Sequence, residues 1–263
     1  MIHTAKIDKS DITKLTNDYY TNINTPLDDM WENAIIPSAD FYTIGDEQII
    51  GYFAVDATNT MLQFHLKDGF KHLYTSTFEQ VLEKHKITST LVATYEPEYL
   101  SLCLDNSIKS KPNTILYHEC GNIDITPPLD GLSMDIATIA QLDDVIAFCT
   151  NKVGMEGEWM SYYYKAILPK NSVYLFKYDE NIVGAGEMRH SESSPLYANV
   201  GIMVSKEFRG KNLGSYILSQ MKRVANAKGL KTICSTTVDN IASQKAILKN
   251  GYNLYHRIFR VSF

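Results

Sequence analysis

A weak internal repeat constrains the fold of this chain more than any other feature of its sequence. Asp46–Gly51 (DEQIIG) matches Asp179–Gly184 (DENIVG), and each lies between two apolar runs, a pattern typical of a β-hairpin. Further on, Thr90–Thr94 corresponds to Thr232–Thr236, and each is followed by a short helical pattern and a final strand. Because the matches occur in the same order, duplication explains them better than coincidence between two common hairpins.

The segment between the two copies is rich in residues that interrupt regular structure. It contains Pro127 and Pro128, and two consecutive prolines can neither continue a helix nor lie in a central strand. A chain of 263 residues is long enough for two domains of ordinary size. We therefore expect an N-terminal domain over residues 1–122, a linker over 123–131 and a C-terminal domain over 132–263.

Composition excludes several classes of protein. The formal net charge is −5, so nucleic acid is not expected as a partner, because proteins that bind it through phosphate contacts are normally basic. The four cysteines lie far apart with no C-x-x-C pair, so neither a metal site nor a disulfide framework is expected, and a cytoplasmic location fits. No run of about 18 apolar residues occurs, so no membrane partner is expected.

The apolar patterns of the second half predict alternating strands and helices. Strands are expected over residues 173–178, 182–189, 197–204, 231–237 and 255–263, and helices over 139–149, 159–168, 213–228 and 241–250. In the longest helix, Leu213, Ile217, Met221 and Val224 follow one another at helical spacing. The expected fold class is α/β (α+β), with a mixed, mostly antiparallel sheet and helices on both of its faces.

The segment that carries chemistry is the turn between a strand ending at Val204 and the helix that begins near Leu213. The first backbone N–H groups of a helix have no partner within it and carry a partial positive charge, so such a turn can hold a pyrophosphate. Gly210 and Gly214 let the backbone approach an anion closely, and Asn212 tolerates a left-handed conformation. The spacings of the nucleotide P-loop and of the Rossmann fingerprint are both absent.

The charge around this turn also favours an anionic ligand. Residues 206–231 contain seven lysines and arginines against one acid, Glu207, which gives a local charge of +6 in an acidic chain. Local basicity of this kind suggests one polyanionic ligand. A solvated helix face behind a capped turn is the alternative explanation.

Two segments resemble motifs of the GNAT superfamily of N-acetyltransferases. Arg209–Gly214 (RGKNLG) resembles the acetyl-CoA signature Q/R-x-x-G-x-G/A, with Asn212 in place of its first glycine. Asn240–Tyr252 resembles the later N-x-x-A/S…K-x-G-F/Y element at the expected distance. The chain is therefore identified as two GNAT-like domains in tandem. The first is expected to be a degenerate copy without a cofactor, because Lys67–His72, which matches the signature, lacks its glycine pattern.

The resemblance implies that acetyl-CoA is the cosubstrate and that it enters a split between two parallel strands. The main chain of Ile202, Met203 and Val204 would pair with the pantetheine arm. The pyrophosphate would be held by backbone N–H groups of Gly210, Lys211, Asn212, Leu213, Gly214 and Ser215. Arg209 would shape the turn, and Asn240 would contact the pantetheine or orient the next helix. The reaction implied is direct attack of a neutral amine on the thioester.

Two positions where GNAT enzymes often carry proton-transfer residues hold side chains that cannot transfer protons. Asn199 stands where a glutamate is common, and Ile247 where a tyrosine is common. Glu187 is the candidate general base, acting directly or through water, and the alternative is a carboxylate on a solvated strand face. Glu158, with Glu156, could hold a cationic amine, and the alternative is a solvated loop.

The leading hypothesis is an acetyl-CoA-dependent N-acetyltransferase that acts on a small, cationic primary amine. Two alternatives stay open: transfer of a different acyl group, and a non-catalytic CoA-binding sensor or adaptor, which Asn199 and Ile247 favour. Two alternative roles are open for the first half. It could form a wall of the acceptor cleft, or it could contact a second copy of the chain in a homodimer.

Overall fold

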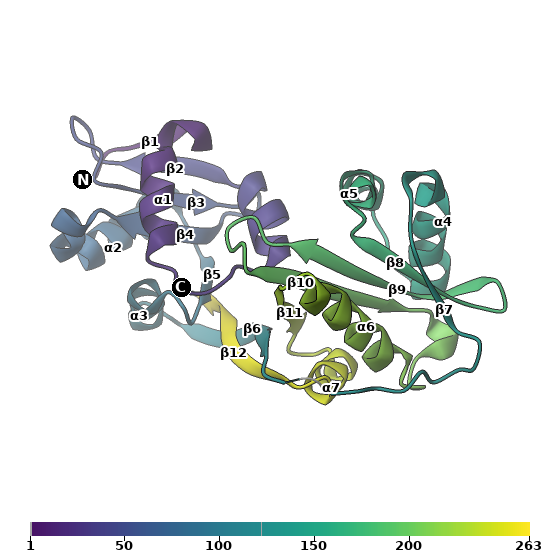
Figure 1. Ribbon diagram of the computed structural model, residues 1–263. Helices are drawn as coiled ribbons and strands as arrows, with labels where there is room; N and C mark the ends of the chain where they lie inside the picture. Colours follow the sequence, from purple (N-terminus) through teal and green to yellow (C-terminus); the bar gives the residue numbers. More distant parts are fainter. Residues whose placement is uncertain (1, 122) are drawn as a thin grey trace. The chain divides into compact units, whose positions relative to one another are not determined.

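The computed structural model describes residues 2–121 and 123–263, and the chain divides into two compact units (Figure 1). The first unit comprises the residues up to Ile115 together with His256–Phe263, and the second comprises Leu116–Tyr255. Each unit contains a mixed sheet flanked by helices, as the sequence predicts. None of the helices within the described ranges is long and apolar enough to cross a membrane.

Within the described residues, the first unit contains five complete strands, the first part of β6 (Lys109–Glu119) up to Ile115, and the end of β12. The complete strands are β1 (Thr4–Ile7), β2 (Asp40–Ile44), β3 (Gly51–Val55), β4 (Thr60–Leu66) and β5 (Ser89–Ala93), and β12 spans Tyr252–Ser262. Its helices are α1 (Thr13–Thr21), α2 (Tyr74–His85) and α3 (Pro97–Asp105). The strands are neighbours in the order β1-β2-β3-β4-β5-β12, and only the β4–β5 pair is parallel.

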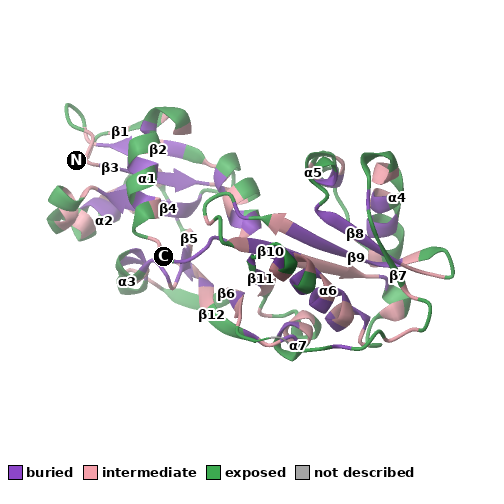
Figure 2. Cartoon of the chain, in the orientation of Figure 1, coloured by how far each residue is buried: buried purple, intermediate pink, exposed green. Residues whose placement is uncertain are grey.

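The central strands of the first unit are covered on both faces. Every residue of β3 and β4 is buried, which Figure 2 shows along this part of the sheet. On one face Phe64 contacts Phe78 of α2 and Tyr99 of α3 in a single apolar cluster. On the other face Tyr19 of α1 lies against Tyr52 with ring centroids 6.2 Å apart. Strands buried on both faces explain why this half of the sequence shows continuous apolar runs.

The end of the chain belongs to the first unit. The last part of β12 pairs antiparallel with β5, from Ile258 opposite Ala93 to Ser262 opposite Ser89. Val261 is fully buried in the apolar cluster of the first unit. The expected C-terminal domain, residues 132–263, therefore includes a segment that the structure assigns to the first unit, His256–Phe263. The physical reason is that β5 needs a partner for its main-chain groups, and this segment supplies it.

In its described residues, the second unit has four α-helices and six strands, the first of which begins in the first unit. Its strands are β6 (Lys109–Glu119) from Leu116 onward, β7 (Ser133–Ile136), β8 (Val173–Tyr178), β9 (Asn181–His190), β10 (Tyr197–Val204) and β11 (Lys231–Thr237), followed by the start of β12. Its helices are α4 (Leu142–Ala147), α5 (Trp159–Ile167), α6 (Leu213–Ala227) and α7 (Ile241–Lys249). The strands are neighbours in the order β7-β8-β9-β10-β11-β6.

Helices cover both faces of the second sheet. Tyr164 of α5 lies in one apolar cluster with Leu175 of β8 and Ala185 of β9. On the opposite face, α6 approaches β9 so closely that a Cβ atom at Gly186 would lie 2.6 Å from Sδ of Met221. The glycine therefore allows the close approach of helix and strand.

Each unit contains one parallel strand pair that separates soon after it begins. In the second unit, β10 pairs with β11 only over Tyr197–Asn199, which lie opposite Lys231–Ile233. Its other edge pairs with β9 as far as Val204. In the first unit, β4 and β5 pair only at Thr60 and Met61. The edges of the diverging strands are therefore available beyond these points, as a split-strand ligand site requires.

Candidate active site

A cavity of about 770 Å³ lies in the second unit where β10 and β11 diverge. Most residues that the sequence predicts for the cofactor line it, namely Ile202, Met203, Val204, Arg209, Gly210, Asn212, Gly214, Ser215 and Asn240. Two predicted residues are not among its lining. Leu213 is buried in the core, and Lys211 lies with Nζ 5.1 Å from the centre of the Phe208 ring. Residues from two motifs that are distant in sequence thus share one cavity.

The turn before α6 has the backbone conformation that the sequence predicts. Gly210 has a φ of 75°, and Asn212, which begins α6 as its N-cap, has a φ of 65°. Arg209 holds the turn through two main-chain carbonyls, donating from Nε to Val204 (3.3 Å) and from Nη2 to Val153 (2.7 Å). The first N–H groups of α6 therefore lie beside the cavity without a partner inside the helix.

Two lysines that line the cavity were not predicted as site residues from the sequence. Lys245 and Lys249 lie one turn apart on α7 and both line the cavity, and Nζ of Lys249 donates to Oδ1 of Asn212 (2.8 Å). Their i, i+4 spacing was visible in the sequence, but the partner that this helix face meets was not. Positive charge at the turn therefore comes partly from a helix that lies more than thirty residues further along the chain.

Some cations counted near the turn serve other contacts. Lys222 is buried, and its Nζ donates to the carbonyl oxygens of Gly121 and of Asn250 (3.2 Å). Burial lowers its pKa. Arg223 forms an ion pair with Asp124 (2.5 Å). The local excess of positive charge is therefore not directed wholly at the cavity.

Asn240 is placed at the start of α7. Its Oδ1 accepts a hydrogen bond from the backbone N–H of Ser243 (3.1 Å), so the side chain caps the helix. Ser243 also lines the cavity. The cap fixes the helix face that presents Lys245 and Lys249.

Glu187 lies in a buried polar cluster, so the alternative explanation, a carboxylate on a solvated strand face, is wrong. Only 6% of the residue is exposed. Its carboxylate accepts hydrogen bonds from the hydroxyls of Tyr163 (2.8 Å) and Tyr164 (3.2 Å) and forms an ion pair with Arg189. Alternate residues of a strand share a face, and this face of β9 is covered by α5.

The cluster connects to the cofactor cavity through Tyr164. The hydroxyl of Tyr164 lies 3.2 Å from Sδ of Met203, which lines the cavity. Burial and the charge of Glu187 raise the pKa of Tyr164, so its hydroxyl stays protonated. Arg189 was missed as a site residue, although it follows Glu187 by two positions and therefore had to share its face.

The other predicted carboxylates lie in solvent. Glu158 is exposed and precedes the first turn of α5, where its side chain makes no capping hydrogen bond. Glu156 is also exposed, and its carbonyl oxygen accepts a hydrogen bond from Nε1 of Trp159 (3.1 Å). In the described part of the chain, neither carboxylate lines the cofactor cavity.

The two positions that depart from the family pattern are both buried. Asn199 is the last residue of β10 that pairs with β11, so it lies where the strands begin to diverge. Ile247 is buried on the inner side of α7. Proton transfer near the split must therefore come from another side chain or from water.

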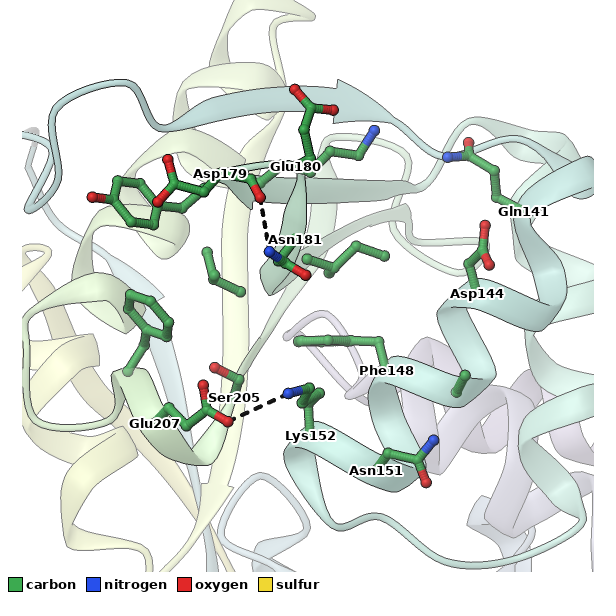
Figure 3. Close-up of a pocket in the computed structure, with 16 residues that line it drawn as sticks. Gln141, Asp144, Phe148, Asn151, Lys152, Asp179, Glu180, Asn181, Ser205 and Glu207 are labelled. Carbon is green, nitrogen blue, oxygen red and sulfur yellow. Dashed lines mark hydrogen bonds and ion pairs between the residues drawn. The ribbon is translucent and has the colours of Figure 1, made fainter.

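A second cavity, of about 780 Å³, lies in the same unit and contains none of the predicted site residues (Figure 3). Its labelled side chains come from α4 and the turn after it, from the β8–β9 hairpin, and from residues 205–207. The Lys152–Glu207 ion pair (3.3 Å) crosses one side of it. Four acidic side chains and two lysines line it, so its lining carries an excess of negative charge.

Comparison with known families identifies both units. Residues 8–120 match the model of an acetyltransferase (GNAT) domain, and residues 139–252 match the acetyltransferase (GNAT) family. The chain belongs to the GNAT superfamily. Its two GNAT domains are arranged in tandem, which confirms the prediction from the internal repeat.

Solved structures agree with a tandem GNAT fold. An acetyltransferase of the GNAT family from Colwellia psychrerythraea is 27% identical, with a TM-score of 0.91 over 99% of both chains. A tandem GNAT protein from the clavulanic acid biosynthesis pathway, solved without AcCoA, is 14% identical with a TM-score of 0.62, covering 100% of this chain and 98% of its own. A GCN5-related N-acetyltransferase from Sphaerobacter thermophilus is 10% identical with a TM-score of 0.65, covering 99% and 95%. No curated protein matches the sequence.

GNAT proteins are acyltransferases, so this tandem GNAT protein is assigned to acyl transfer in general. Among the residues that the structure describes, no group of three or more His, Cys, Asp or Glu side chains could hold a metal ion.

Proposed function

We propose that this GNAT protein transfers the acetyl group of acetyl-CoA to the primary amine of a small cationic acceptor. One observation carries the proposal. Cofactor residues inferred from two separate motifs line a single cavity of about 770 Å³ at the point where two parallel strands diverge. A strand edge beside a helix N-terminus suits a ligand with an amide-containing arm and a pyrophosphate.

Main-chain groups would provide most of the cofactor contacts. The pantetheine arm would pair with the edge of Ile202–Val204, which β11 leaves open. The N–H groups at the start of α6 would hold the pyrophosphate, and Lys245 and Lys249 would add positive charge. Both lysines are exposed, so salt should weaken their attraction for the phosphate groups.

The chemistry requires a neutral amine, because an ammonium group has no lone pair with which to attack the thioester carbonyl. Glu187 is proposed to take the amine proton, directly or through one water molecule. The C–N bond then forms and the C–S bond breaks, and the second proton that the nitrogen loses passes through water to the departing thiolate. A thiol has an ordinary pKa near 8.5, so the leaving group needs no strong acid. Arg189 and the two tyrosines are proposed to position the carboxylate.

Two observations support a cationic acceptor: the negative net charge of the chain and the acidic loop before α5. Glu156 and Glu158 are exposed in that loop and are proposed to attract the amine before it is deprotonated. Replacing both by glutamine should raise KM for a cationic amine and leave kcat close to its original value. A neutral amine of the same size provides the comparison.

The first experiment is incubation with acetyl-CoA and a panel of small amines while free thiol is measured. Thiol release with at least one amine is expected. Glu187→Gln should bind acetyl-CoA normally but lower kcat about 10²–10⁴-fold, the usual range for general-base catalysis. Glu192→Gln, an exposed carboxylate beyond the end of β9, is the matched control and should change neither. Unchanged kcat in Glu187→Gln would exclude this residue as the base.

A CoA-binding sensor is the second candidate, and it is favoured because Asn199 and Ile247 cannot transfer protons at positions where GNAT enzymes often carry residues that do. Calorimetry separates the two functions: acetyl-CoA binding without thiol release for any amine would support the sensor. Failure to bind acetyl-CoA would contradict both. Mass spectrometry of the thioester that co-purifies with the protein would show whether the acyl group is acetyl or longer.

A further inference from the structure

The first unit contains a cavity of about 200 Å³ at the place that corresponds to the cofactor cavity of the second. It is lined by Phe64 and His65 near the end of β4 and by residues 96–99 at the start of α3, the helix that follows β5. In the second unit, the end of β10 and the start of α7 hold the same positions around their split. The two cavities are therefore equivalent within the duplicated fold.

The chemistry of the first-unit cavity is opposite to that of a phosphate site. Glu96 is the N-cap of α3, the position that Asn240 holds on α7. The turn after β4 begins with Asp68, and the nearby Lys71 is already paired with Asp68 (3.3 Å) and Glu98 (3.1 Å). The first-unit cavity therefore has a carboxylate where the second-unit cavity has the uncharged Asn240, and its one nearby lysine is already paired. A polyphosphate would be repelled.

Glu96 is buried without a cationic partner. Only 6% of the residue is exposed, and its carboxylate accepts hydrogen bonds from the hydroxyl of Tyr19 and from the N–H of Ala93 (3.0 Å). An ionised carboxylate can accept about four hydrogen bonds. No lysine or arginine of the described ranges forms an ion pair with it. Burial raises the pKa of Glu96 to about 7, which shows how poorly the surroundings compensate its charge.

Two further polar groups beside this cavity lack hydrogen-bond partners. Nε2 of His65 and the hydroxyl of Tyr95 are buried, and neither has a partner within the residues that the structure describes. Both residues are more than nine-tenths buried, and both line the cavity. Burial lowers the pKa of His65, so a neutral imidazole can present an acceptor nitrogen. Unpartnered buried polar groups are costly, and a ligand that bonds to them would remove that cost.

The remaining walls of the cavity are mostly aromatic. Tyr19, Phe64, Tyr74, Tyr95 and Tyr99 all line it. Aromatic faces attract cations, and they do so most strongly when the cation is desolvated. A buried carboxylate surrounded by aromatic rings is therefore suited to an ammonium group.

We propose that this pocket, formed by His65, Glu96 and the five aromatic residues that line it, binds a small primary ammonium compound. An alkylammonium group has three N–H donors, which match the carboxylate of Glu96, the imidazole of His65 and the hydroxyl oxygen of Tyr95. The volume limits the ligand to a few carbon atoms beyond the ammonium group. The site would make the first GNAT domain a receptor for an amine, and it does not depend on the reaction proposed for the second.

The test titrates the full-length protein with propylammonium while NMR follows the chemical shifts of labelled tyrosine and histidine side chains. For so small a ligand, Kd is expected on the order of millimolar. 1-Propanol and propionate have a similar size without the positive charge, and each should bind at least tenfold more weakly. Tetramethylammonium lacks N–H donors and should also bind more weakly than propylammonium.

Variants connect any binding to this pocket. Glu96→Gln should weaken propylammonium binding at least tenfold, and Tyr95→Phe, which removes one oxygen atom only, should weaken it several-fold. Glu79→Gln, an exposed carboxylate on α2, is the matched control and should bind as the original protein does. If Glu96→Gln does not fold, Tyr95→Phe carries the test alone.

Three results of the propylammonium titrations would overturn the proposal. They are absence of saturable propylammonium binding, equal affinity for propylammonium and 1-propanol, and unchanged affinity in both Glu96→Gln and Tyr95→Phe. Binding of coenzyme A to the first unit would also overturn it, because the pocket would then be a cofactor cleft. None of these results decides whether the second unit catalyses acetyl transfer, since thiol release is measured separately.

Discussion

Two buried carboxylates show how differently the same residue type behaves in the two units. Glu187 has Arg189 as its ion-pair partner and two tyrosine hydroxyls as donors, so its charge is compensated where it lies. Glu96 has a tyrosine hydroxyl and one backbone N–H, and no cation among the described residues pairs with it. Burial of an uncompensated charge is expensive, so Glu96 tends to keep its proton.

This difference predicts a pH-dependent stability that Glu96→Gln removes. Between pH 4.5 and about 7, folded Glu96 retains the proton that the unfolded chain has already released, because its pKa is raised from 4.5 to about 7. The free energy of unfolding should therefore fall by up to about 3 kcal/mol across this range and level off above it. Denaturant unfolding of both proteins from pH 4.5 to 8 measures the difference between them. An identical pH dependence in Glu96→Gln would show that this carboxyl does not titrate as described.

At the scale of elements, the β10–turn–α6 segment determines where a cofactor can lie. Gly214 lines the cavity, and a Cβ atom there would already lie 3.2 Å from Cδ1 of Ile202. The first turn of α6 and the edge of β10 therefore meet with little space between them. A large side chain at this glycine must point into the cavity or displace the strand edge.

Gly214→Trp is therefore expected to abolish acetyl-CoA binding, with at least a hundredfold loss of affinity in calorimetry. Gly69→Trp is the matched control, because Gly69 lies in the corresponding turn of the first unit and a Cβ atom there would have no neighbour within 4 Å. It should leave binding unchanged. Normal acetyl-CoA binding by Gly214→Trp would mean that the cofactor site lies elsewhere.

The contact between α6 and β9 gives a prediction about stability. A Cβ atom at Gly186 would lie 2.6 Å from Sδ of Met221, so Gly186→Val must displace either the Met221 side chain or the helix. Overpacking of this kind typically costs about 1–3 kcal/mol in the free energy of unfolding. Gly201→Ala should cost less, because its new Cβ would make an ordinary contact with Glu187 at 3.6 Å. Denaturant unfolding of both variants provides the comparison.

At the scale of the whole molecule, the C-terminal residues stabilise the unit that contains the N-terminus. β12 begins in the second unit, and its last residues pair with β5 and place Val261 in the core of the first. The first unit is therefore incomplete as a continuous stretch of sequence. Its stability depends on residues that follow the second unit in the sequence.

Deletion of residues 258–263 should destabilise the first unit selectively. The loss of buried Val261 and of the hydrogen bonds to β5 should cost about 3 kcal/mol or more. Hydrogen exchange should become faster in β5, whereas acetyl-CoA binding to the second unit should persist. Unchanged exchange in β5 would contradict the assignment of these residues to the first unit.

The sequence by itself determined the features that depend on neighbours along the chain. The tandem organisation followed from the repeated hairpin and strand patterns, and family comparison confirms it. The left-handed turn before α6 followed from Gly210 and Asn212, because backbone conformation is set locally by residue type. The helix over 213–228 followed from apolar spacing, and the structure places α6 over Leu213–Ala227.

Only the tertiary structure decided which distant side chains share an environment. It placed Lys245 and Lys249 at the turn before α6, buried Glu187 beside Tyr163 and Tyr164, and joined the end of β12 to the first unit. Burial and charge compensation depend on residues that are far apart in sequence, so no local pattern reports them. The pocket around Glu96 is of the same kind: the sequence contains its residues, but their chemistry arises only where β4, β5 and the first turn of α3 converge.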